Sequence, residues 1–168
     1  MTDIRDLYVT ALQNTHALEL QALQIMGRQV ERLERYPEMA DALRRHIAET
    51  HQQRDRLDEA LESLASSPSA LKEGVLGFMG NMAALAHAPA DDEVLKNAFA
   101  NRAFENYEIA AYDALLVFAE AAGHTTSIKA FEQSRREEVA MADQVAALVA
   151  PTARRYVELT TAGAKADR

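Results

Sequence analysis

Apolar residues recur every three to four positions over four long segments of the chain, which is the spacing of α-helices that each bury one face. Residues that favour helix ends stand between these segments. Pro37 suits the first turn of the second helix, and Gly123 suits the end of the third. Thr125, Thr126 and Ser127 can cap the fourth. The pattern therefore predicts four long helices, at about residues 3–36, 37–65, 90–123 and 127–151.

The connection between the second and third helices is much longer than the other two. Residues 66–69 favour a turn, and the apolar residues between 68 and 87 predict a short extra helix within the connection. One long crossover between two short-looped hairpins is typical of the ferritin-like bundle, whereas an up-down-up-down bundle has short loops throughout. The predicted fold is therefore an all-α, ferritin-like four-helix bundle made of two antiparallel helical hairpins.

Composition supports this fold. The strong helix formers Ala, Leu, Glu, Gln and Arg dominate, whereas Gly (6) and Pro (4) are rare. A length of 168 residues fits one domain, which we expect at residues 1–159. Pro151 is expected to end or kink the last helix, and residues 154–159 could continue as helix after it. Residues 160–168 are expected to form a disordered or frayed C-terminal tail.

Charge and cysteine content exclude several classes of function. The net charge of −8 argues against a nucleic-acid-binding surface, which needs clustered Lys and Arg. The absence of cysteine excludes disulfides, iron–sulfur clusters and thiol nucleophiles. The N-terminus lacks the apolar core of a signal peptide, and no run reaches the ~18 apolar residues of a membrane span. We therefore expect a cytoplasmic protein with no nucleic-acid or membrane partner.

Each predicted long helix carries one glutamate on its otherwise apolar stripe: Glu19, Glu49, Glu108 and Glu138. Burying an ionised carboxylate is costly, so such residues need a counter-charge, a shifted pKa or a metal ion. The two glutamates of each hairpin are 30 residues apart, which brings them to nearly the same level of an antiparallel pair. The pattern predicts a carboxylate cluster suited to Fe or Mn, or less selectively to Zn or Mg. The alternative is that these side chains lie at the stripe edge and reach solvent.

Two further residues are candidate ligands of this cluster. Gln53 lies one helical turn after Glu49 and could bind a metal ion through its amide oxygen, or serve as a polar neighbour. Glu105 lies three residues before Glu108 and could form a Glu-x-x-Glu pair with it, the alternative being a solvent-facing position.

Two more residues are candidates for contacts with the ligands. His16 lies three residues before Glu19 on the same helix face. It could be a nitrogen ligand, a hydrogen-bond donor to a ligand, or a histidine whose hydrogen bonds are satisfied at the boundary of the core. Tyr112 lies four residues after Glu108, and its phenol could donate a hydrogen bond to a carboxylate or simply pack in the core.

With these motifs the chain resembles the YciE/YciF-type ferritin-like proteins over about residues 4–149. The resemblance rests on residues 46–53 (HIAETHQQ), residues 105–112 (ENYEIAAY), residues 136–138 (REE) and the stretch around Glu19. It implies a stress-associated protein with a ferritin-like fold and a two-metal site, in a family whose biochemical activity is poorly defined.

The chain departs from typical ferritin-like sites, which place a Glu-x-x-His pair on two helices. Gln52 and Met141 stand three residues after Glu49 and Glu138, so neither pair is present. Ala142 stands where the family usually has an acidic residue. These departures predict a weaker second metal position.

By analogy, the resemblance implies two metal ions, Fe first with Mn or Zn as alternatives. Glu49 and Glu138 would bridge the ions, and Glu19 and Glu108 would be terminal ligands. Dioxygen or peroxide would be the reaction partner of a ferroxidase-like or peroxide-handling oxidoreductase, expected as a homodimer. Two alternatives stay open: a non-catalytic helical stress or interaction protein with a structural ion or none, and a cage-forming storage ferritin.

Overall fold

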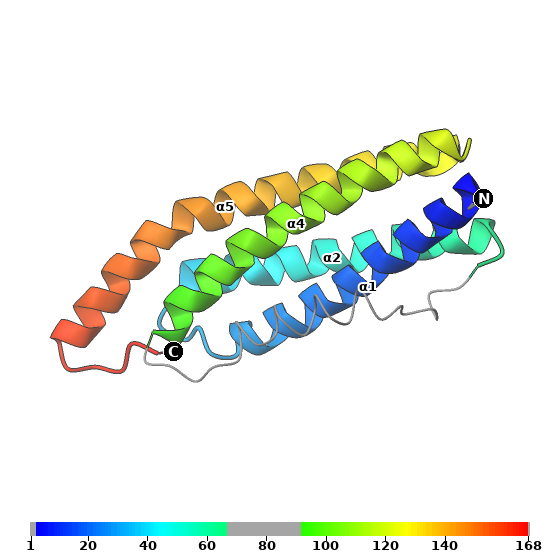
Figure 1. The fold of residues 1–168 in the computed structure, drawn as a ribbon. Helices are drawn as coiled ribbons and strands as arrows, with labels where there is room; N and C mark the ends of the chain where they lie inside the picture. Colours follow the sequence, from blue (N-terminus) through cyan, green and yellow to red (C-terminus); the bar gives the residue numbers. More distant parts are fainter. Residues whose placement is uncertain (1–2, 67–91, 168) are drawn as a thin grey trace.

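The computed structural model describes residues 3–66 and 92–167, and four long helices account for most of them (Figure 1). Within these residues no strand occurs, so the all-α prediction is confirmed. The extra helix expected at residues 68–87 lies outside the described residues. The helices are α1 (Ile4–Val30), α2 (Pro37–Ser63), α4 (Glu93–Ala121) and α5 (Ile128–Thr161), with the 3-10 turn η1 (Thr125–Ser127) before α5.

The helices form two antiparallel hairpins, α1 with α2 and α4 with α5, that pack side by side. α1 also contacts α4, and α2 also contacts α5, so each helix packs against one helix of the other hairpin. Figure 1 shows that α2 ends at the opposite end of the bundle from the start of α4. This order of ends requires a crossover, as the ferritin-like bundle has and as the sequence predicts.

The apolar core is divided into two clusters by a buried polar layer. One cluster lies toward the α1–α2 turn and includes Met26, Met39, Leu43, Val94 and Val145. The other lies toward the α4–α5 turn and includes Tyr8, Leu12, Leu57, Leu115 and Phe131. The buried polar layer lies between the clusters and contains Glu19, His46, Gln53, Glu105, Glu108 and Glu138.

The two inter-helix turns differ in how well the sequence predicts them. Gly123 has a φ of 70°, which glycine adopts without strain, and it ends α4 as predicted. α1 ends at Val30, six residues before the predicted end. The residues after Val30 form turns that bury Leu33 and Tyr36 in the first cluster, so apolar spacing continued past the end of the helix.

The C-terminal segment differs from its expected frayed state. Pro151 lies inside α5, which continues to Thr161 and turns across the end of the bundle (Figure 1). Ala166 is 7% exposed, and its carbonyl accepts a hydrogen bond of 2.6 Å from the Tyr36 hydroxyl. Proline removes one backbone N–H and kinks a helix without always ending it. Contact with the α1–α2 turn therefore orders a segment that has no apolar periodicity of its own.

No described helix is both long enough and apolar enough to cross a membrane.

Candidate metal centre

Four buried side chains from three helices converge in the polar layer. His46 comes from α2, Glu105 and Glu108 from α4, and Glu138 from α5. Each offers one ligand atom, and these four atoms lie within 4.8 Å of one another. Glu105 and Glu108 are three residues apart and so share one face of α4. One imidazole nitrogen and several carboxylate oxygens form a donor set that suits Fe, Mn or Zn.

α1 adds a fourth carboxylate beside this group. Glu19 is fully buried, and its Oε1 accepts a hydrogen bond of 2.5 Å from the Tyr112 hydroxyl of α4. Its other oxygen, Oε2, has no hydrogen-bond partner within the described residues. The negative charges of Glu138 and Glu105 act on the Glu19 carboxyl, as expected for neighbours in one layer. Tyr112 therefore holds one oxygen of Glu19 and leaves the other available.

Unpaired oxygen atoms distinguish this layer from an ordinary buried polar network. Among the described residues, hydrogen bonds are missing at Oε2 of Glu19 and Glu105, at both carboxylate oxygens of Glu108 and Glu138, and at both amide atoms of Gln53. A buried polar atom without a partner costs about 1–3 kcal/mol, and a charged one costs more. Such a group needs protons or bound cations, and its oxygen atoms are the ligands that a metal ion would take up. The residues present therefore fit a metal site.

His46 lies between the buried carboxylates and a carboxylate at the surface. Its Nδ1 is 2.9 Å from Oε2 of Glu49, and its Nε2 is 3.3 Å from Oε2 of both Glu105 and Glu138. If Nδ1 carries the proton and donates it to Glu49, the Nε2 lone pair points at two carboxylates. That arrangement is favourable with a cation between them, with a protonated ring, or with a protonated carboxyl that donates to Nε2. A carboxylate that orients a metal-binding histidine in this way is common in metal sites.

Protons balance the charge when no metal is bound. Burial lowers the pKa of His46, but the surrounding carboxylates of Glu105, Glu138 and Glu49 outweigh it and raise the pKa far above its ordinary value. Burial raises the pKa of Glu105 to about 7, although His46 opposes the shift. Burial and then the charge of Glu138 raise the pKa values of Glu19 and Glu108 well above normal. The metal-free layer therefore holds protons that a metal ion would displace.

Glu49 differs from its expected position. Its side chain is 44% exposed and lies on the surface side of His46, so the expectation of one buried glutamate from every long helix does not hold for α2. The buried stripe of α2 runs through His46, Thr50, Gln53 and Leu57, and Glu49 lies roughly 70° from its centre. His46 takes the inward place.

The other predicted residues are distributed as follows. Glu19, Gln53, Glu105, Glu108 and Glu138 are all buried in the polar layer. His16 is buried too, but its Nε2 lies 3.0 Å from Oδ1 of Asp58 on α2, and it does not belong to the group of four ligands. The missed residue is His46. Its signal was present in the sequence, since it lies four residues before Thr50 and seven before Gln53 on the inward face.

Comparisons with known proteins agree with this architecture. The family described as "Domain of unknown function (DUF892)" matches residues 3–158. Protein YciF of Escherichia coli (strain K12) is 26% identical over 144 residues, which are 83% of this chain and 86% of that protein.

Solved structures show the same fold. A protein of Xanthomonas campestris pv. campestris is similar with a TM-score of 0.79 and 29% identity, over 95% of this chain and 99% of that one. The Escherichia coli stress protein YciF has a TM-score of 0.76 and 23% identity, over 89% of this chain and 96% of that one. YcfI from Rhodopseudomonas palustris has a TM-score of 0.73 and 26% identity, over 86% of this chain and 93% of that one. Together with the match over residues 3–158, these similarities confirm the predicted resemblance: the chain belongs to the DUF892 family of YciF-type helical proteins.

Proposed function

We propose that this chain is a ferritin-like carboxylate protein that binds two divalent metal ions, iron first, and uses them in redox chemistry with dioxygen or peroxide. The observation that carries the proposal is the buried group of His46, Glu105, Glu108 and Glu138. Their ligand atoms lie within 4.8 Å of one another, and most of their carboxylate oxygens have no hydrogen-bond partner among the described residues. Packing alone does not account for that combination, because His46 is the only basic side chain in contact with this group of carboxylates within the described residues, and both oxygens of Glu108 stay without a partner there.

Charge supports two ions rather than one. Four buried carboxylates, those of Glu19, Glu105, Glu108 and Glu138, carry a charge of −4 when ionised, which two divalent ions would neutralise. His46, Glu105, Glu108 and Glu138 would hold the first ion. Glu19, with the amide oxygen of Gln53, would provide the additional ligands of the second, together with carboxylates shared between the ions.

The chain's own residues would support this chemistry in three ways. Glu49 would orient His46 through its Nδ1, and Tyr112 would fix the position of Glu19. The apolar clusters on both sides of the layer would exclude bulk water. When bound, a pair of iron ions supplies one-electron steps for the oxidation of iron(II) or the reduction of peroxide. Such chemistry would suit a stress-related role, which the description of Escherichia coli YciF as a stress protein also suggests.

A structural ion in a non-catalytic protein is the second candidate function, and one observation favours it. Ala142 and Met141 are buried on α5 next to the layer, at positions where a carboxylate or histidine could have bound a second ion. With fewer ligands on that side, a single ion that stabilises the bundle is sufficient.

Removal of one central ligand should abolish tight metal binding. We expect Glu138→Gln to lower the affinity for iron(II) or zinc(II) by at least about 100-fold, because the amide keeps the shape but loses the charge. The matched control is Glu132→Gln, an exposed glutamate on the same helix, which should bind like the wild type. Metal content after aerobic purification and calorimetric titration measure the effect. Unchanged stoichiometry in Glu138→Gln would refute the site.

Substitution of Glu49 should weaken metal binding less than substitution of a direct ligand does. If it only orients His46, Glu49→Gln should weaken metal binding by about 10–100-fold and keep the stoichiometry, as for other residues that hold a metal-binding histidine. If Glu49 instead bridges two ions, as the ferritin analogy implies, its substitution should halve the stoichiometry or abolish binding. Titration of Glu49→Gln beside Glu138→Gln and Glu132→Gln separates the two roles.

Oxygen consumption distinguishes the redox proposal from the structural-ion alternative. Iron(II) added to the metal-free protein should cause oxygen uptake faster than the buffer blank and faster than the Glu138→Gln variant. The reason is that carboxylate ligands stabilise the oxidised ion. An oxygen electrode measures the rates, and hydrogen peroxide can replace dioxygen in a parallel assay. Stoichiometric binding of zinc(II) with no uptake above the blank would support the structural-ion function and contradict the redox proposal.

The metal-free protein should become less stable as the pH rises from 5.5 to 7.5. The pKa values of Glu19, Glu105, Glu108 and His46 are all raised by folding, so unfolding releases protons above the unfolded carboxyl pKa of 4.5. Proton release on unfolding means that the free energy of unfolding falls with increasing pH, by up to about 2.7 kcal/mol over these two pH units for each proton released. Urea unfolding in the presence of a chelator measures the free energy of unfolding of the metal-free protein at each pH.

Zinc(II), which is redox-inert, should reverse that trend because its ligands must be deprotonated. The stabilisation that zinc(II) provides should therefore be larger at pH 7.5 than at pH 5.5. A metal-free protein that is equally stable, or more stable, at the higher pH would contradict the assigned proton uptake.

A further inference from the structure

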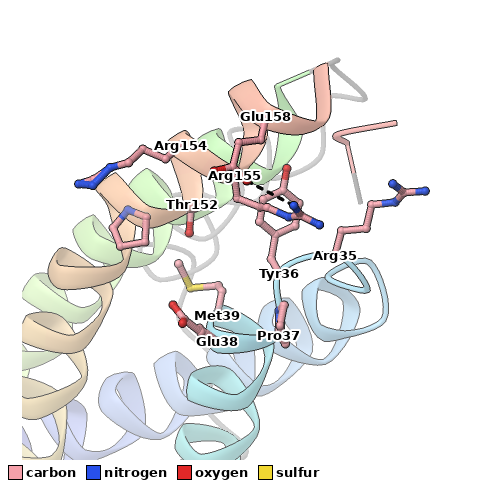
Figure 2. Close-up of a pocket in the computed structure, with 10 residues that line it drawn as sticks. Arg35, Tyr36, Pro37, Glu38, Met39, Thr152, Arg154, Arg155 and Glu158 are labelled. Carbon is pink, nitrogen blue, oxygen red and sulfur yellow. Dashed lines mark hydrogen bonds and ion pairs between the residues drawn. The ribbon is translucent and has the colours of Figure 1, made fainter. Parts of the chain in front are cut away.

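A pocket of about 390 Å³ lies outside the metal layer, between the α1–α2 turn and the part of α5 that follows Pro151 (Figure 2). Its size lies within the range of pockets that bind small organic molecules. Pro37 begins α2 at this pocket, nine residues before His46, which is ~13 Å along the helix at 1.5 Å per residue. The pocket is therefore separate from the carboxylate group.

The first turn of α2 presents hydrogen-bond donors at this pocket. Its N-cap residue, Tyr36, makes no side-chain cap, and Pro37 has no N–H. The first backbone bond of the helix runs from the Ala40 N–H to the Tyr36 carbonyl. The N–H groups of Glu38 and Met39 precede that bond and lack both a helical acceptor and a side-chain cap. Free N–H groups at a helix N-terminus favour a bound anion.

A second feature on the facing helix also indicates a ligand. Thr152 of α5 lines the pocket and is only 5% exposed, yet its hydroxyl has no hydrogen-bond partner within residues 3–66 and 92–167. In Figure 2 the Thr152 side chain points from α5 toward Met39, across the pocket. The Thr152 oxygen is not one of the fully enclosed atoms that lack a partner, so it is open to the pocket, where it can donate a hydrogen bond to a ligand oxygen.

The charged residues of the pocket favour an anion. Three arginines (Arg35, Arg154 and Arg155) and two glutamates (Glu38 and Glu158) line it, a net charge of +1 from three positive and two negative groups. Arg155 and Glu158 pair at 3.3 Å, whereas Arg35 and Arg154 have no carboxylate partner within the part of the chain that the structure describes. Figure 2 shows these two side chains extending outward from opposite sides of the pocket, from where they can fold over a ligand.

Apolar groups form the remaining walls, and a fixed contact keeps the walls together. The side chains of Pro37, Met39 and Pro151 line the pocket beside the ring of Tyr36. The Tyr36 hydroxyl is held by the Ala166 carbonyl at 2.6 Å, which ties the α1–α2 turn to the end of the chain. Such a mixture of apolar walls and a few convergent donors is typical of sites for small organic ligands.

We propose that this pocket binds a small organic anion, with a carboxylate or phosphate group at the Glu38 and Met39 N–H groups and Thr152, and an apolar body against Met39, Tyr36 and Pro151. Arg35 and Arg154 contribute charge at the rim. The proposal is independent of the metal site, because none of these residues belongs to the carboxylate layer.

Titration calorimetry of the full-length protein with phenyl phosphate, benzoate and inorganic phosphate tests the proposal. We expect phenyl phosphate or benzoate to bind with a Kd below about 1 mM, and inorganic phosphate to bind at least about fivefold more weakly because it lacks the apolar body. The stronger of the two organic probes identifies the anionic group. Absence of binding of both organic probes at 10 mM-scale concentrations, or equal binding of inorganic phosphate, would overturn the proposal.

Variants connect the binding to this pocket. Thr152→Val keeps the shape and removes the hydroxyl, so it should weaken binding about fivefold or more, whereas Thr152→Ser should restore it. The double variant Arg35→Gln/Arg154→Gln should weaken binding about tenfold or more. The matched control is Arg136→Gln, an exposed arginine 18 residues earlier on α5, which should change the Kd by less than about twofold. Equal losses in the control and the pocket variants would mean non-specific attraction and contradict the assignment.

Discussion

The removal of four carboxylates and an imidazole from water, at the middle of a helical bundle, is the constraint on which the rest of this structure depends. Ionised groups in such a place are unfavourable unless a cation compensates them. Burial therefore raises the pKa of Glu105, while the neighbouring carboxylates raise the pKa of His46 although burial opposes them. The apolar clusters on either side supply the stabilisation that holds the helices together despite it. The same layer therefore lowers the stability of the bundle and gathers the side chains that could bind a metal ion.

Much of the fold could be predicted because its determinants are local. The 3.6-residue apolar period identified the helices, and Pro37 and Gly123 identified two of their boundaries. The end of α1 was misplaced because Leu33 and Tyr36 continue the apolar spacing beyond the last helical residue. The packed C-terminal segment was missed for a different reason, since it depends on a long-range hydrogen bond that leaves no pattern in the sequence.

The site was predictable where a glutamate lies at the centre of a stripe and unpredictable at its edge. Glu19, Glu108 and Glu138 lie among fully buried apolar neighbours, so periodicity alone places them inside. Glu49 and His46 are three residues apart on α2, and either could have turned inward. The outcome depends on how α2 is rotated about its axis against the other hairpin. The observed rotation buries Thr50, Gln53 and Leu57 and turns Glu49 toward solvent. A single sequence contains no measure of that rotation.

The division of the core into two apolar clusters has a consequence for how the helices are aligned along the bundle axis. Apolar contacts are poorly directional, so four helices with long apolar stripes could slide past one another by a turn, ~5.4 Å, with little loss of buried surface. In this bundle such a slip would move Glu19, Glu108 or Glu138 into Leu, Met and Val side chains and leave its partners behind. The polar layer thus acts as an axial alignment mark that selects one register of the four helices, much as a buried polar residue selects the register of a coiled coil.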